Sequence, residues 1–305
     1  FRRVLFRSIS GVEERLEDNP FKRLRRSVAN ADDERISGPD EHRPRTAGGV
    51  HLHARQLDVV ADVARRRHRA THGQVGAEFD AVLNCVAAGG GGAEGYRRSY
   101  LEGMRSVLAW ARRARVGTLV YTSSTSVYAQ GGGGRVDESM AAEGRNETAR
   151  IPVETENLLR NGSDTLGFRW FILRLAGIYG PERHSLLDAI RAGYTSLPGT
   201  DGHRLNLAHR DDIVDAIFAA IAAPPAVRNE VFNVADDAPA TKQEVAAWLA
   251  AELGKPAPAR VESGSATARA VPDRIIANDR IKALLGWKPG HPSFREGYAE
   301  ILSKG

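Results

Sequence analysis

Hydrophobic and polar residues follow two different periods from Phe79 to the end of the chain. Short, largely apolar runs such as FDAVLNCVAA and FRWFILRL predict buried β-strands. Longer segments such as GAEGYRRSYLEGMRSVLAWARRAR separate them, and their apolar residues return at the spacing of one helical face. Buried strands that alternate with helices predict an α/β fold with a doubly wound parallel sheet, covered by helices on both faces.

The same alternation continues to the C-terminus. GTLVYTSS, LNLAH and EVFNVAD predict strands, whereas RDDIVDAIFAAIAA and TKQEVAAWLAAELG predict helices. The last helix begins with Thr241 and Glu244, which have the spacing of a capping box. VETENLLRNG predicts a helix that has Pro152 in its first turn and ends at Gly162. SLLDAIRAG, which follows Arg183, has an apolar face that we expect to pack in the same region.

Residues 1–78 lack both periods and mix arginine, histidine, glycine and proline. The chain has a formal net charge of +5, and nearly all of the basic surplus lies in this segment. It is either a solvated or disordered basic leader, or a segment that is not natural sequence and replaces the first part of the domain. An arm that binds nucleic acid is a third interpretation, although aromatic residues for base stacking are nearly absent. We therefore divide the chain into this anomalous segment and a domain over residues 79–305.

Composition narrows the class of protein further. No apolar run approaches the length of a membrane span, and FRRVLFRSIS lacks the apolar centre of a signal peptide. Cys85 is the single cysteine, so it forms no internal disulfide, and we expect it to lie in the core. No spacing of histidine and cysteine indicates a metal site. These features predict a cytoplasmic protein that binds neither membrane nor nucleic acid.

Small and hydroxyl residues follow the predicted strands. CVAAGGGG ends one strand, YTSSTS ends the next, and AGIYGPER follows a third. In a parallel sheet the carboxyl ends of the strands face one crevice, which is where ligands bind. Ser123, Ser124 and Thr125 are therefore candidate site residues, and a serine that holds a substrate oxygen normally needs an acid or base nearby.

Four stretches carry a resemblance to a known family. LVYTSSTSVYA, LRLAGIYGPERH, LNLAHRDDIVDAI and FNVADDAPATKQEVAAWLA, in this order, resemble the NAD-dependent epimerase/dehydratase family of extended short-chain dehydrogenases/reductases. The resemblance covers residues 79–303. It implies a Rossmann domain that binds NAD or NADP, and a C-terminal substrate lobe drawn mainly from residues 177–204 and 230–305. It also implies a nucleotide sugar, or a related hydroxyl or carbonyl compound, as substrate. A homodimer through long helices such as residues 92–115 is expected by analogy.

The resemblance also assigns roles to single residues. Ser124 matches the catalytic serine and would orient a substrate oxygen, and Arg150 would bind an anionic group near the nicotinamide. The residues matched to cofactor binding are Ala87, Ala88, Gly89, Thr122, Ser123, Gly177, Ile178 and Tyr179. The residues matched to substrate binding are Thr125, Arg183, Arg204 and His209. Structural interpretations stay open beside these roles, because Ser124 also suits a turn cap, Arg150 a helix surface and His209 a structural position.

The chain departs from the family in two places. Residues 1–78 contain no glycine-rich turn between a strand and a helix, which is the family's site for the cofactor pyrophosphate. Thr148 and Pro152 stand where the family has the tyrosine and lysine that move the proton. ARIPVETE resembles an atypical branch of the family that lacks this pair.

Three functions are compatible with these residues. The first is an NAD(P)-dependent oxidoreductase of the epimerase/dehydratase type. The second is a noncatalytic protein that binds a dinucleotide or a nucleotide sugar but lacks the proton shuttle. The third is an incomplete domain that binds no cofactor, in which unpaired strand edges would lower stability.

Overall fold

The computed structural model of the chain describes residues 4–5, 78–88, 90–199, 202–262 and 272–304. The chain divides into two compact units. Residues 1–121 and 154–170 form the first, and residues 122–153 and 171–305 form the second. The anomalous segment that we assigned to residues 1–78 lies outside the described residues, except for Val4, Leu5 and Glu78.

A five-stranded sheet carries the α/β pattern that the sequence predicts. Its strands, in spatial order, are β1 (Val4–Leu5), β2 (Glu78–Asn84), β3 (Arg115–Ser124), β5 (Arg169–Leu175) and β10 (Glu230–Val234). β1 pairs with β2, β2 with β3, and β5 with β10, each pair in parallel. β1 is a strand that the sequence pattern did not predict, because a two-residue apolar run has no measurable period.

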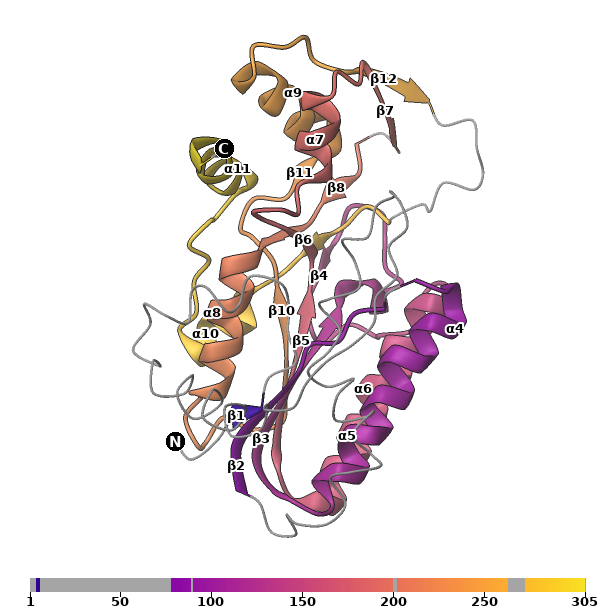
Figure 1. The fold of residues 1–305 in the computed structure, drawn as a ribbon, viewed down its shortest axis with the longest axis vertical. Coiled ribbons are helices and arrows are strands. Elements are labelled where there is room, and N and C mark those ends of the chain that lie inside the picture. The colour runs from indigo at the N-terminus through magenta and orange to yellow at the C-terminus, as the bar shows by residue number, and fades with distance from the viewer. Residues whose placement is uncertain (1–3, 6–77, 89, 200–201, 263–271, 305) are drawn as a thin grey trace, which may run out of the picture. The chain divides into compact units, whose positions relative to one another are not determined.

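The helices of the first unit pack against each other through a glycine. α4 (Gly92–Tyr96), a π-helical turn (Arg97–Glu102) and α5 (Gly103–Ala111) follow one another, and α6 (Glu147–Leu166) lies beside them (Figure 1). A Cβ on Gly162 would lie 2.8 Å from a methyl carbon of Leu108, so only glycine allows this approach. The sequence predicted that the helix ends at Gly162, and this prediction is wrong. α6 continues to Leu166, and Gly167 follows it in a left-handed conformation.

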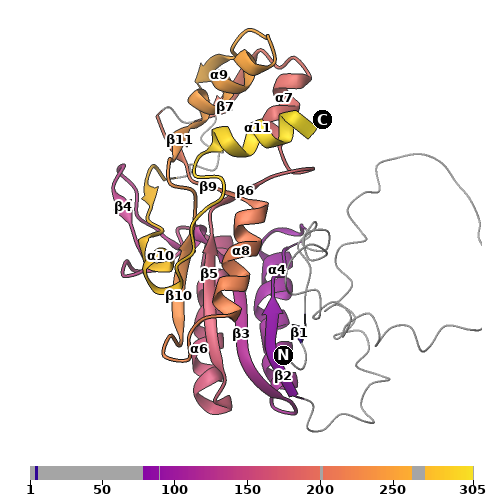
Figure 2. The same ribbon diagram turned by 90° about the vertical axis from the view of Figure 1, so that its left-hand side faces the viewer.

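The second unit adds short strand pairs to β5 and β10. These pairs are β6 (Gly177–Tyr179) with β9 (Leu207–His209), β8 (Arg204–Leu205) with β11 (Ala240–Thr241), β7 (Ser196–Gly199) with β12 (Ala259–Glu262), and β4 (Arg135–Val136) with β13 (Ile275–Ile276). Its helices are the 3-10 turn Thr125–Val127, α7 (Ser185–Arg191), α8 (Arg210–Ile221), α9 (Lys242–Glu252), α10 (Asp279–Leu285) and α11 (Phe294–Lys304). α8 and α10 lie beside β10 (Figure 2). α9 begins with the capping box that Thr241 and Glu244 predict.

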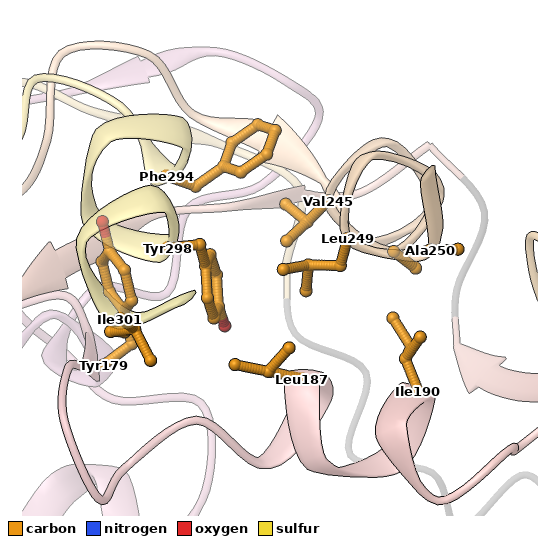
Figure 3. Close-up of a cluster of buried hydrophobic side chains, with 10 residues drawn as sticks. Tyr179, Leu187, Ile190, Val245, Leu249, Ala250, Phe294, Tyr298 and Ile301 are labelled. Carbon is orange, nitrogen blue, oxygen red and sulfur yellow. The ribbon is translucent and has the colours of Figure 1, made fainter. Parts of the chain in front are cut away.

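Three helices of the second unit enclose a separate apolar core. Leu187 and Ile190 of α7 face Val245 and Leu249 of α9, and Tyr298 of α11 packs against the same cluster (Figure 3). The apolar face of SLLDAIRAG thus packs as the sequence predicts. Tyr179, at the end of β6, belongs to this core, so the cluster fixes the middle of the AGIYGPER segment.

Two further sequence predictions concern the class of protein. Cys85 is buried, as expected for a core cysteine. None of the helices in the described part of the chain is long and apolar enough to cross a membrane.

Candidate functional site

The loop after β3 presents the candidate serine. Ser124 is half-buried, and its hydroxyl oxygen accepts a hydrogen bond from the backbone N–H of Ser126 at 3.1 Å. Thr122 and Ser123 are buried in the strand, whereas Thr125 is half-buried at the start of the 3-10 turn. Ser124 therefore caps the turn, and it stands at the carboxyl end of a parallel strand, where sheets of this kind bind ligands.

Tyr128 fixes the far end of this turn. Its hydroxyl accepts a hydrogen bond from Nη1 of Arg174 at 2.8 Å and donates one to Oδ1 of Asn233 at 2.8 Å. The guanidinium of Arg174 also lies over the tyrosine ring, 4.8 Å from its centroid. Burial raises the pKa of Tyr128, so its hydroxyl stays protonated and keeps this donor role. The serine loop, which we define as residues 124–136, is thus anchored to β5 and β10.

A cavity of about 610 Å³ begins where the serine loop becomes rich in glycine. Its lining residues are Ala129, Gly131, Gly132, Arg145, Gly202, His203, Pro272 and Asp273. Asp273 is engaged, because its carboxylate accepts hydrogen bonds from the backbone N–H of Arg204 at 3.0 Å and from Nη1 of Arg204 at 3.0 Å. These contacts hold the pKa of Asp273 below its ordinary value. Arg145 is exposed and has no hydrogen-bond or ion-pair partner among the described residues, so its charge is available to a ligand.

The first turns of α6 contain Thr148 and Pro152, which stand at the positions of the family's tyrosine and lysine. Asn146 precedes the helix, and its Oδ1 accepts hydrogen bonds from the N–H of Ala149 and the hydroxyl of Thr148, both at 2.9 Å. This cap starts the helix at Glu147, so Pro152 lies inside α6. The sequence placed Pro152 in the first turn of the helix, and that prediction is wrong. Arg150 is exposed on the helix surface.

The remaining candidates of the lobe lie along β6, β8 and β9. Gly177 belongs to β6, and a Cβ there would lie 3.0 Å from the carbonyl oxygen of Asn206, so the glycine serves the pairing with β9. Ile178 accepts a hydrogen bond from Nε of Arg183 at 3.2 Å through its carbonyl oxygen. The hydroxyl of Tyr179 is buried and donates to the carbonyl oxygen of Ser293 at 3.3 Å.

His209 belongs to a buried polar cluster at the start of α8. Its Nδ1 accepts a hydrogen bond from the N–H of Asp211, and its ring lies against the ring of His291, tilted by 40° with centroids 3.7 Å apart. His291 places Nδ1 at 3.2 Å from both carboxylate oxygens of Asp212 and Nε2 at 2.8 Å from Glu300. These carboxylates raise the pKa of His291 to about 9. Burial, with the charge of His291 beside it, lowers the pKa of His209 to about 4.

This cluster has the residue types of a metal site but the contacts of an ion pair. Ligand atoms of His209, Asp212 and His291 all lie within 4.8 Å of one another. Both ring nitrogens of His291 already face carboxylates, however, so neither is free to bind a metal ion in this arrangement. Backbone N–H groups of Gly290 and His291 complete the hydrogen bonds to Asp212. A charged imidazole held between two carboxylates therefore accounts for the geometry.

The cofactor candidates of the first unit follow β2. Ala87 is exposed and Ala88 is half-buried, whereas Gly89 lies outside the described residues. Asn84, the last residue of β2, is buried, and neither polar atom of its side-chain amide has a hydrogen-bond partner among the described residues. A buried amide normally makes hydrogen bonds, so a further polar group is expected at this end of β2.

Several residues of this region were not found from the sequence. Arg174, Asp273, Arg274 and His291 hold the loop, the cavity wall and the polar cluster, yet each is a single charged residue in an ordinary sequence context. The one available signal was Arg174 itself, a charge within the otherwise apolar strand FRWFILRL, which a buried strand tolerates only with partners.

Comparison with known proteins agrees with this architecture. The family model of the NAD dependent epimerase/dehydratase family matches residues 27–235. The chain belongs to this family. The cofactor in the description of the family, NAD, agrees with the NAD or NADP that the sequence predicts.

The matched region covers only part of each individual relative. A protein named 3-diazoavenalumate denitrifying reductase, from a Streptomyces species, is 32% identical over 49% of this chain and 51% of its own length. Protein YeeZ of Escherichia coli K12 is 30% identical over 63% of this chain and 65% of its own length. The chain thus spans between half and two thirds of these curated relatives.

Solved structures share the fold. UDP-glucuronic acid 4-epimerase from Bacillus cereus, in complex with NAD, aligns with a TM-score of 0.64 over 74% of this chain and 75% of its own. The two sequences are 18% identical, so this similarity concerns the fold. It establishes the Rossmann-type arrangement of a parallel sheet flanked by helices.

Proposed function

We propose that this protein is an NAD(P)-linked oxidoreductase of the epimerase/dehydratase type that acts on an anionic hydroxyl or carbonyl compound, such as a nucleotide sugar. The position of Ser124 carries this proposal. The hydroxyl lies half-exposed at the carboxyl end of a parallel strand, and its loop runs into the wall of a cavity within the same unit. The resemblance gives this serine its role of orienting a substrate oxygen.

Small residues at the strand ends suit a dinucleotide. Ala87 and Ala88 leave the backbone after β2 open to close approach, and Asn84 beneath them lacks hydrogen-bond partners among the described residues. Thr122 and Ser123, together with Gly177–Tyr179, are the other residues proposed to hold the cofactor. NAD or NADP, when bound, supplies the acceptor or donor of the hydride.

The proton of the reaction needs a route other than the family's tyrosine. Thr148 has no accessible phenolate, its hydroxyl is bound to Asn146, and Pro152 has no amine. Ser124 orients the substrate oxygen in this proposal, and water or an unidentified group carries the proton. Arg150, exposed on α6, is proposed to bind a phosphate or carboxylate group of the cofactor or the substrate.

The cavity supports a negatively charged substrate. Arg145 contributes a cation that has no ion-pair partner among the described residues, whereas Asp273 is paired with Arg204. Thr125, Arg183 and His209 complete the proposed substrate residues. His209 would act by positioning β9, since its ring is fully buried. The structural neighbour from Bacillus cereus is named for UDP-glucuronic acid, and the relative from Streptomyces for a reductase reaction, so the test must span both chemistries.

One observation favours a second function. Because both members of the usual tyrosine and lysine pair are replaced, the protein is alternatively a noncatalytic NAD(P) or nucleotide-sugar binding protein. Cytoplasmic localisation and a homodimer belong to either proposal, and the oligomeric state is checked by light scattering of the purified chain.

The test is a thermal-shift titration followed by a turnover assay. The full chain is titrated with NAD, NADH, NADP and NADPH, because a ligand that binds only the folded state raises the melting temperature. Conversion of UDP-glucose, UDP-glucuronic acid and aromatic carboxylates is then followed by chromatography, because an epimerase or dehydratase returns the hydride to its substrate and leaves no net change in the nicotinamide. Absorbance of the reduced nicotinamide is followed in parallel to detect a net oxidation or reduction. Turnover that falls at least about 100-fold in Ser124→Ala, with the melting temperature unchanged, supports the oxidoreductase. Binding without turnover supports the second function, and no shift with any dinucleotide contradicts both cofactor proposals.

A further inference from the structure

Arg274 is a buried cation whose hydrogen bonds, among the described residues, all go to backbone oxygens, while its guanidinium also lies 6.0 Å from the centroid of the Tyr128 ring. The residue is 5% exposed. Nη1 donates to the carbonyl oxygens of Tyr128 at 2.7 Å and Gln130 at 3.2 Å, and Nη2 donates to the carbonyl oxygen of Thr125 at 2.9 Å. All three acceptors lie in the serine loop, so one side chain holds the backbone of residues 125–130.

A charged side chain is unusual at a position as buried as that of Arg274. Burial of a guanidinium is costly unless its donors are satisfied, and in the described part of the chain no carboxylate lies within ion-pair distance of Arg274. The fork of donors on an arginine matches several acceptors at fixed angles, which lysine or glutamine cannot do. The three hydrogen bonds therefore indicate that Arg274 defines the geometry of the serine loop and does not only fill space beneath it.

The backbone around Arg274 connects the same loop to the substrate lobe. Its carbonyl oxygen accepts from Nδ2 of Asn206 at 3.0 Å, in the segment that joins β8 to β9. The preceding residue, Asp273, binds Arg204 through its carboxylate and accepts from the N–H of Gly133 at 2.9 Å through its carbonyl oxygen. Residues 272–276 thus contact the serine loop on one side and the strand that carries Arg204 on the other.

We propose that Arg274 is a positioning residue that sets the orientation of Ser124 by holding the carbonyl groups of Thr125, Tyr128 and Gln130. This inference rests on the proposed function for its chemical consequence, but its geometry is testable without turnover. The hydrogen bond from the Ser126 N–H to the Ser124 hydroxyl oxygen reports directly on the orientation of the serine. If Arg274 fixes the loop, loss of the guanidinium weakens this hydrogen bond, and the Ser126 amide exchanges faster.

The experiment compares Arg274→Ala and Arg274→Lys with wild type in the full chain. Hydrogen exchange of the Ser126 and Tyr128 amides is measured by NMR, with and without a non-denaturing concentration of guanidinium chloride and with sodium chloride as the salt control. Arg280→Ala is the matched control, because Arg280 is an exposed arginine nearby in sequence that binds Glu230 instead.

We expect both amides to exchange at least about ten-fold faster in the Arg274 variants, and guanidinium to restore protection in Arg274→Ala. Exchange in Arg280→Ala stays at the wild-type rate. Unchanged exchange in the Arg274 variants overturns the proposal, and so does faster exchange throughout the second unit that guanidinium does not reverse. If the assay above gives turnover, kcat falls at least about ten-fold while the dinucleotide Kd stays within about two-fold. Absence of turnover in wild type contradicts the proposed function and leaves the exchange result decisive for Arg274.

Discussion

The serine loop and the first turns of α6 should carry the two halves of one active site, yet they are built differently. Buried groups hold the loop from several sides, since Arg174, Asn233 and Arg274 bind it through side-chain hydrogen bonds. The first turn of α6 is capped by Asn146, which also binds the hydroxyl of Thr148, and Arg150 is exposed. The loop of the proposed orienting serine is therefore held by buried charged and polar side chains, whereas the polar contacts of Thr148 are those of a helix cap.

This difference also appears in the free-energy cost of each region. A buried cation costs free energy unless its partners are in place, and the serine loop supplies hydrogen-bond partners to both Arg174 and Arg274. At the start of α6, the hydroxyl of Thr148 binds the capping residue Asn146, and Pro152 lies inside the helix. An orienting serine without its usual partner fits both functions proposed above, which is why turnover rather than binding separates them.

The largest expected effect comes from loosening the serine loop at Arg174. Replacement by methionine in Arg174→Met removes the donor to Tyr128 and leaves the hydroxyl buried without it. We expect the free energy of unfolding to fall by about 3 kcal/mol, which urea denaturation measures. Arg183→Met is the matched control, because Arg183 is exposed, and its loss should cost less than about 0.5 kcal/mol. A similar loss in both variants would show that the loop is not held more strongly than the surface.

A second prediction concerns pH and contrasts the serine loop with the polar cluster of His291. The pKa of His291 is raised to about 9 from 6.5, so its stabilisation is fully present below pH 6.5 and is lost as the pH rises through about 9. Arg174 and Arg274, which bind the serine loop, are arginines, and arginine side chains stay charged over this range. We expect stability to fall on the order of 2 kcal/mol between these pH values because of His291.

The control for the pH prediction is His291→Gln, in which this alkaline loss should shrink. Asp236 contributes a loss in the same direction that begins at lower pH, because burial raises its pKa from 3.8 to about 8 and its deprotonation in the folded state is unfavourable over that range. His184→Gln serves as a matched histidine, since His184 also contacts a carboxylate, that of Asp188. An alkaline loss of the same size in His291→Gln and wild type would assign it to other groups.

The sequence predicted the strands and helices around the site better than the buried side chains that hold the serine loop. Strand ends rich in small residues, the capping box of Thr241 and Glu244, and the helix over SLLDAIRAG follow from local patterns, and the structure contains them. Gly162 misled the prediction because glycine marks both helix ends and close helix packing, and only the neighbour Leu108 distinguishes the two. Arg274 was not predictable, since its role depends on carbonyl groups more than 140 residues away.

The smallest expected effect tests whether Thr148 has any role beyond the helix cap. Its hydroxyl donates to Asn146, and the same Oδ1 accepts from Ala149, so Asn146→Ala should lower the free energy of unfolding by about 1 kcal/mol. Thr148→Val removes only the hydroxyl and should cost about 0.5 kcal/mol, because the backbone hydrogen bond of the cap remains. Asn157→Ala, on the exposed face of the same helix, is the control for asparagine loss. If Thr148 only completes the cap, Thr148→Val leaves both the dinucleotide shift in melting temperature and any turnover unchanged. A loss of turnover in Thr148→Val without a loss of stability would instead place a proton-transfer role at the position of the missing tyrosine, and the contrast between the two halves of the site would no longer hold.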